Sequence, residues 1–268
     1  KYPRESWLGG SRFPGVSAKK FGFVAEDRDL FEQVADTVGL IRRDANHAIW
    51  CRHPLAFLVE AADDISYRVI DIEDGFRLDY LSLSQVETLF QTVAGGDDLL
   101  AARLHNIGDD KGRVEFLRAK VINAAVSQAV SCFLDNEESI LLGQQEKPLM
   151  AMISGRDSME QLVDVARERI YCAPEVVEIQ AAGFQVIGDL LERFIQALDD
   201  LAEHEEAATA QSHMLSQLIP QQFKGDRPGV KAGHYSRLLS LTDFVAGMTD
   251  SYAVSFYKKV TGISLPGR

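Results

Sequence analysis

The hydrophobic positions of this chain recur with helical spacing along most of its length. Over residues 114–134 they cover more than half of a helix circumference, which predicts a central helix. No stretch alternates with the two-residue period of a strand. The pattern therefore predicts an all-α fold, organised as a single domain over 1–268. Further helices are predicted from about Asp27, from a capping box at Ser84 and Glu87, and over 158–170, 174–202 and 235–262.

The helix predicted over 52–76 carries the most information. Pro54 suits its first turn, where a missing N–H costs nothing, and Gly75 suits its end. On a wheel of about 3.6 residues per turn, one side of this helix is apolar. We expect that side to face the core: Leu55, Leu58, Val59, Ala62, Ile65, Val69 and Ile72.

Asp63, Tyr67 and Asp71 are spaced four apart, so they form a ridge on the opposite side of this helix. Two carboxylates that flank a phenol can bind a divalent cation and hold a sugar hydroxyl. A solvated acidic face explains the same pattern, because like charges at this spacing repel by only about 0.2–0.5 kcal/mol per pair. Asp64 is an alternative ligand, although it is rotated by about 100° from Asp63.

Charge and cysteine content narrow the functional class. The net charge of −12 argues against general nucleic-acid binding, so single-stranded DNA is a weak candidate partner. Basic and aromatic residues nevertheless interleave in the first twenty positions, which suits a triphosphate as well as a basic leader with no binding role. Three scattered cysteines and the lack of a long apolar run favour a cytoplasmic protein without a membrane span.

Several motifs carry a family resemblance over nearly the whole chain. The chain reads KYPR at 1–4, KKFGF at 19–23, RHPL at 52–55, EAADDISY at 60–67, DIEDG at 71–75 and TDFVAGMTDSYA at 242–253. In this order they resemble the bacterial dGTPase-like deoxynucleoside triphosphate triphosphohydrolases. These enzymes belong to the HD superfamily and are related to the vertebrate SAM-and-HD dNTPases.

The resemblance implies an HD-domain-like helical fold that hydrolyses dNTPs, dGTP included, to the deoxynucleoside and inorganic triphosphate. It makes Asp63 a metal ligand for Mg²⁺ or Mn²⁺, or for iron, nickel or zinc if histidines contribute. Tyr67 is then expected against the deoxyribose, and Asp71 is expected to accept a hydrogen bond from its 3′-hydroxyl. Within a substrate-loop region at 1–25, Lys1, Tyr2 and Lys20, with Lys19 as an alternative to Lys20, are expected to contact substrate. Arg237 is a further candidate, unless it simply pairs with an acid.

One departure from the family pattern is as informative as the match. The family's metal site uses a histidine and an adjacent His-Asp pair, and this chain contains no His-Asp dipeptide. We therefore expect the C-terminal portion of such an enzyme, inactive alone, with the catalytic residues on an upstream segment or a separate chain. Relatives form tetramers or hexamers, so a homo-oligomer is expected. A non-catalytic nucleotide-binding or oligomerisation module is the alternative, and dGTP alone is not distinguished from a broad dNTP range.

Overall fold

The computed structural model describes residues 22–44, 47–96, 98–224 and 233–264. The regular secondary structure of the described residues is helical apart from one small hairpin, which confirms the all-α class. Contacts divide the chain into two compact units, 1–173 and 174–268, each with its own hydrophobic cluster. The single domain expected over 1–268 is therefore described below as two separate units.

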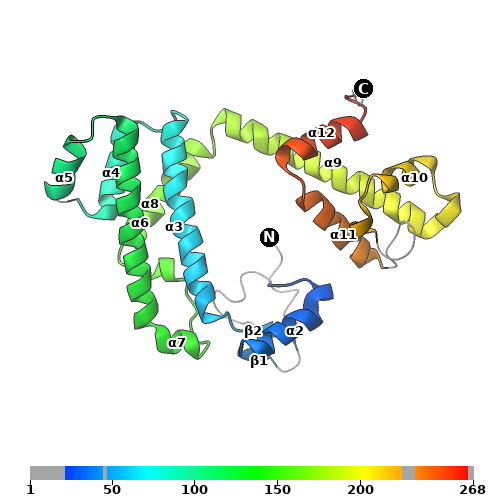
Figure 1. Ribbon diagram of the computed structural model, residues 1–268, viewed down its shortest axis with the longest axis horizontal. Helices are drawn as coiled ribbons and strands as arrows, with labels where there is room; N and C mark the ends of the chain where they lie inside the picture. Colours follow the sequence, from blue (N-terminus) through cyan, green and yellow to red (C-terminus); the bar gives the residue numbers. More distant parts are fainter. Residues whose placement is uncertain (1–21, 45–46, 97, 225–232, 265–268) are drawn as a thin grey trace. The chain divides into compact units, whose positions relative to one another are not determined.

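The described part of unit 1 begins with short helical segments and a hairpin and continues with a group of longer helices. The hairpin pairs β1 (Arg42–Asp44) with β2 (Ile49–Trp50) in antiparallel fashion. In Figure 1 the longest helices, α3 and α6, run beside α4. The helical elements are η2 (Ala25–Asp27), α2 (Arg28–Thr37), α3 (Pro54–Arg77), α4 (Leu83–Ala94), α5 (Asp98–His105), α6 (Asp110–Asp135), α7 (Glu137–Leu141), η3 (Leu149–Ala151), α8 (Arg156–Val165) and the π-helical turn η4 (Ala166–Ile170).

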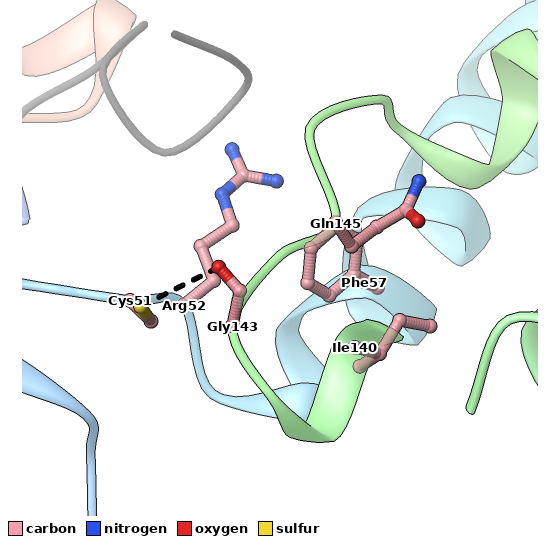
Figure 2. A pocket seen from close by; sticks show the side chains of 6 residues that line it. All are labelled: Cys51, Arg52, Phe57, Ile140, Gly143 and Gln145. Carbon is pink, nitrogen blue, oxygen red and sulfur yellow. Dashed lines mark hydrogen bonds between the residues drawn. The ribbon is translucent and has the colours of Figure 1, made fainter. Parts of the chain in front are cut away.

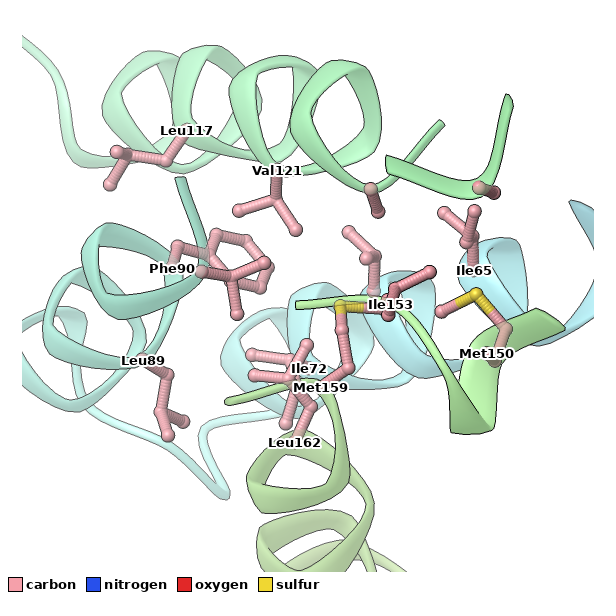
Figure 3. Packing of buried hydrophobic residues seen from close by; sticks show 14 of the residues in the cluster. Ile65, Ile72, Leu89, Phe90, Leu117, Val121, Met150, Ile153, Met159 and Leu162 are labelled. Carbon is pink, nitrogen blue, oxygen red and sulfur yellow. The ribbon is translucent and has the colours of Figure 1, made fainter. Parts of the chain in front are cut away.

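The core of unit 1 lies where α3, α4, α6 and α8 meet. Figure 3 shows side chains from these helices interdigitating, with Phe90 and Val121 close to the centre. Burying one such side chain contributes roughly 1.5–3 kcal/mol to folding. One carboxylate is also buried here: Glu73, at 3% exposure, accepts hydrogen bonds from Arg77 (2.7 Å) and Arg118 (2.6 and 2.8 Å). These charge-assisted bonds offset the cost of removing Glu73 from water.

Unit 2 is built on the long helix α9 (Pro174–His204), against which the remaining helices pack. Its core contains Phe194, which stacks on Phe256 with ring centroids 5.7 Å apart. At the end of α9, Asp200 accepts a hydrogen bond from Ser212 Oγ at 2.6 Å and so holds the next helix. The other elements are η5 (Glu205–Ala207), α10 (Ala210–Gln217), η6 (Gln221–Phe223), α11 (His234–Ala246) and α12 (Asp250–Val260).

Several predicted helix boundaries differ from the structure. The helix predicted over 235–262 is two helices, because the Thr249 hydroxyl accepts from Tyr252 N and starts α12 as an N-cap. The capping box of α4 uses Ser82 and Gln85, so the predicted pair at Ser84 and Glu87 is wrong. Helix α3 continues past Gly75 to Arg77.

No helix within the described residues combines the length and the hydrophobicity needed to cross a bilayer.

Candidate functional site

Helix α3 forms where the sequence predicts the site helix at 52–76. His53 is its N-cap and accepts a hydrogen bond from Leu55 N through Nδ1, and Pro54 occupies the first turn. Both features satisfy or remove N–H groups that have no partner inside a helix. The start and length of the helix were therefore readable from local sequence.

The buried face of α3 is rotated from the predicted one. The residues in the core are Phe57, Ala61, Ile65, Val69 and Ile72. Leu55 and Val59, which the pattern placed in the core, are 57% and 69% exposed. The core of unit 1 covers only one sector of α3, and the hydrophobic pattern is wider than that sector.

The structure keeps the predicted ridge together on the outer side of α3. Asp63 and Tyr67 are exposed, and Asp71 is partly buried. Tyr67 is 54% exposed, so about two turns of helix present a phenol between two carboxylates to whatever contacts this surface. Asp63, Tyr67 and Asp71 thus share one side of α3, as the spacing predicted, and their roles stay predictions.

Tyr171 joins this ridge and was missed by the sequence analysis. Its hydroxyl donates a hydrogen bond to Asp71 Oδ2, and its oxygen lies 2.5 Å from Oη of Tyr67. The two rings are tilted at 38° with centroids 6.3 Å apart. A phenol has one proton, so when Tyr171 donates to Asp71, Tyr67 is the donor between the two phenols. Tyr67, Tyr171 and Asp71 form a polar chain, which we call the tyrosine–aspartate cluster.

Burial and hydrogen bonding shift the pKa values in this cluster. The pKa of Asp71 is raised, chiefly by burial; the hydrogen bond from Tyr171 opposes this, and the charge of Asp74 adds to it. The pKa of Tyr171 lies far above its ordinary value, because burial and then the hydrogen bond that it donates to Asp71 disfavour the phenolate. Tyr171 is therefore a neutral donor at physiological pH, and Asp71 is the acceptor that orients it.

Asp63 differs from the other acids on the outer side of α3. Among the described residues it has no hydrogen-bond or ion-pair partner, so its carboxylate oxygens are available to a ligand. Asp64, the alternative ligand, points to Arg68 at 3.6 Å. The neighbouring acids are likewise occupied: Glu60 with Arg52, Asp71 with Tyr171 and Asp74 with Arg77.

A metal would need more ligands than this ridge supplies. Within the described ranges, no group of three or more His, Cys, Asp or Glu side chains converges on one point. Asp63 fits one oxygen position for a hard divalent cation, and the remaining ligands would have to come from residues outside the described set.

Two hollows on the described part of unit 1 are lined by residues other than those of the ridge. One, of about 450 Å³, is a shallow depression beside α7 that is lined by Glu137, Glu138, Leu141 and Leu142. Figure 2 shows a second at the start of α3, between Cys51, Arg52, Phe57, Ile140, Gly143 and Gln145, which is too narrow for a water molecule. The ridge of the described chain is thus an open surface.

Arg237 lies in unit 2, on α11. It is 8% exposed, and its Nε and Nη2 donate to Asp199 Oδ1 at 2.9 and 2.7 Å. His234 Nδ1 lies 3.2 Å from the same oxygen. Arg237 is therefore paired with an acid, as the alternative reading expected, and contact with a nucleotide stays a prediction. Lys1, Tyr2 and Lys20 lie outside the described residues.

Comparison with known proteins finds one matching family model and relatives that match nearly the whole chain. Residues 154–259 match the family model described as a phosphohydrolase-associated domain. Over 99% of its length the chain is 37% identical to a deoxyguanosinetriphosphate triphosphohydrolase-like protein of Synechocystis. A protein of the same description from Listeria monocytogenes is 29% identical over 93% of the chain, and the deoxyguanosinetriphosphate triphosphohydrolase of Salmonella paratyphi A is 25% identical over 98%.

These relatives are considerably longer than the chain. The matched region covers 58% of the Synechocystis and Salmonella proteins and 56% of the Listeria protein. The chain thus spans somewhat more than half the length of the curated relatives it matches.

Proposed function

We propose that this chain, which belongs to the family of deoxyguanosinetriphosphate triphosphohydrolase-like proteins, supplies part of the active site of a dNTP hydrolase. The reaction would convert a dNTP, dGTP included, to the deoxynucleoside and inorganic triphosphate. The observation that carries the proposal is the ridge on α3. There the Asp63 carboxylate, which has no partner among the described residues, lies one helical turn from Tyr67 and two from Asp71 of the tyrosine–aspartate cluster.

The tyrosine–aspartate cluster suits a deoxyribose. Asp71 keeps acceptor capacity after binding Tyr171, since a carboxylate offers about four lone-pair positions, so it can also accept from a sugar hydroxyl. The exposed ring of Tyr67 can lie against the apolar face of the sugar. A ring in that place leaves little room for a 2′-hydroxyl, which would favour deoxynucleotides over ribonucleotides.

Asp63 would hold a divalent cation. Its oxygens suit Mg²⁺ or Mn²⁺, and histidine ligands from elsewhere would extend the choice to iron, nickel or zinc. When bound, the cation supplies Lewis-acid chemistry that offsets negative charge on the phosphate oxygens. By resemblance, the other ligands and the histidine that would act as general acid lie outside this chain.

The leaving triphosphate needs basic partners. Lys1 and Lys20, with Tyr2 beside them and Lys19 as the alternative to Lys20, remain our candidates for that role from the N-terminal motifs. Arg237, six residues before Asp243 of the C-terminal motif, remains a further candidate. Arg237 would have to contact the phosphates while it keeps Asp199, or exchange one acidic partner for another.

An open ridge would have to be covered in the working protein, because electrostatic catalysis depends on excluding water. Leu55 and Val59 are exposed near Asp63, and Ile70 is exposed beside Asp71. We propose that the portion of a full-length protein not matched here covers them, either as a segment of the same chain or as a partner. A cytoplasmic homo-oligomer, tetrameric or hexameric, is the assembly we expect.

Asp63→Ala in the full-length protein tests the proposal. We expect metal-dependent release of triphosphate from dGTP to fall by at least about 100-fold, since a cation with few protein ligands loses one of them. The matched control is Asp64→Ala, which removes a neighbouring carboxylate that is already paired with Arg68. Turnover close to that of the unmodified protein in Asp63→Ala would exclude Asp63 as a ligand.

A nucleotide-binding module without hydrolysis is the second candidate, and the open ridge without converging ligands favours it. It predicts that the full-length protein is stabilised by dGTP but does not turn it over. Ligand at 100 times its dissociation constant should add about 2.7 kcal/mol to stability. An oligomerisation module would show no nucleotide-dependent change in melting temperature.

A further inference from the structure

The contact between Gly75 and Ile170 lies directly beside the tyrosine–aspartate cluster. Gly75 is one helical turn after Asp71 on α3, and Ile170 immediately precedes Tyr171. The two contacts are therefore neighbours, Ile170 with Gly75 and Tyr171 with Asp71. The placement of the Tyr171 hydroxyl, 100 residues away from Asp71 in sequence, depends on how closely these two segments approach.

Gly75 allows a close approach of Ile170 because it has no Cβ, which every other residue type would place in this contact. A Cβ at this position would lie 2.5 Å from Ile170 Cδ1, 3.0 Å from Ile170 Cγ1 and 3.1 Å from Leu81 Cδ1. Gly75 is helical, its φ is not positive, and α3 continues past it to Arg77. A glycine inside a helix is less stable than alanine there, so neither helix propensity nor termination explains it. Close packing against Ile170 does.

Ile170, which contacts Gly75, is the last residue of a π-helical turn. Residues Ala166–Ile170 form η4 at the end of α8, and both Ala166 and Ile170 are buried. A π turn holds one residue more than an α turn, so it changes the direction in which the following side chains point. Such turns are rare and occur often at functional sites. Here the turn is anchored at both ends, and Tyr171 is the next residue.

We infer that Gly75 and Ile170 are positioning residues: their contact fixes the end of the π turn, so that the Tyr171 hydroxyl meets Asp71 and Tyr67. Neither residue carries a polar side chain, so their effect on a nucleotide would be exerted through Tyr171. The inferred placement of the Tyr171 hydroxyl depends only on the packing of Gly75 against Ile170. Its consequence for dGTP rests on the function proposed above.

The experiment adds one carbon on the Gly75 side of the contact and, in a second variant, also removes one on the Ile170 side. Gly75→Ala overfills it, and Gly75→Ala with Ile170→Val removes the Cδ1 that lies nearest to the added Cβ, so that total volume is conserved. Gly188→Ala is the matched control, because a Cβ on that helical glycine meets nothing within 4 Å. The first readout, on this chain, is the pKa of Asp71 followed by ¹³Cγ NMR, with Tyr171→Phe as the reference for a lost hydrogen bond.

We expect Gly75→Ala to raise the pKa of Asp71 toward its value in Tyr171→Phe, because the displaced phenol no longer stabilises the carboxylate. The double variant should restore the original pKa, and Gly188→Ala should not change it. Ile170→Ala removes packing at the contact instead of overfilling it. If Gly75→Ala does not fold, the Asp71 pKa measured in Ile170→Ala tests the inference in its place. An unchanged Asp71 pKa in Ile170→Ala, or in a folded Gly75→Ala, overturns the inference.

The second readout separates the positioning inference from the proposed function. In the full-length enzyme, Gly75→Ala should raise KM for dGTP about as much as Tyr171→Phe does, with a smaller effect on kcat and recovery in the double variant. If the Asp71 pKa responds while KM for dGTP stays constant in both variants, the positioning role stands and the sugar-binding role of the cluster is wrong.

Discussion

Removing a single oxygen in Tyr171→Phe is the sharpest test of the tyrosine–aspartate cluster. The change deletes the donor to Asp71 and the contact with Tyr67, and it leaves the ring in place. A hydrogen bond to a charged group contributes about 1.5–3 kcal/mol net. Asp71 is partly exposed, so solvent screening brings our expectation to about 1–1.5 kcal/mol of stability at neutral pH.

The pKa of Asp71 determines how the stability difference between Tyr171→Phe and wild type changes with pH. Burial raises the pKa of Asp71, so the unfavourable burial of its charge costs stability as pH rises through that pKa. The bond from Tyr171 acts in the opposite sense, because it favours the ionised carboxylate. Removing it should therefore raise the Asp71 pKa further, by about one unit for a loss of about 1.4 kcal/mol.

Two measurements check this. Urea unfolding of wild-type and Tyr171→Phe chains should differ in midpoint at pH 7, and the difference should shrink as the pH falls below the Asp71 pKa of the wild type. NMR of the Asp71 carboxyl carbon should report the higher pKa in the variant directly. A stability difference that does not change with pH, or an Asp71 pKa that stays the same, would refute the hydrogen-bonding argument.

Three further predictions concern other residues. Glu73→Gln should lower unfolding stability by about 2 kcal/mol in urea titrations, because Arg118 loses a charge-assisted buried partner; an unchanged midpoint would contradict this. Asp200→Asn should lower the melting temperature at pH 7, and this loss should shrink only as pH falls below the ordinary aspartate range toward the lowered Asp200 pKa, because hydrogen bonds, chiefly from Ser212, stabilise the ionised form; a loss that does not change with pH would count against it. Tyr67→Ala in the full-length protein should reduce the preference for dGTP over GTP, measured as the ratio of kcat/KM values, and an unaltered ratio would exclude that role.

The sequence by itself determined the helices and the spacing of residues along each of them. Pro54 and the apolar periodicity predicted the site helix, and the four-residue spacing placed Asp63, Tyr67 and Asp71 on one ridge. Both are local properties, because a helix fixes the relation between residues a few positions apart. The motifs also identified the family from the residues alone, and the comparisons confirm it.

Only the tertiary structure decided which residues from distant segments meet. Tyr171 reaches Asp71 across 100 residues, through a π turn and a glycine contact that no local pattern predicts. Val59 looked like a core residue, but it is exposed because the core of unit 1 covers a narrower sector of α3 than the apolar positions span. The hydrogen bond from Arg237 to Asp199 likewise depends on how the helices of unit 2 pack. Such contacts depend on how whole helices pack, and neither helix propensity nor hydrophobic period specifies that packing.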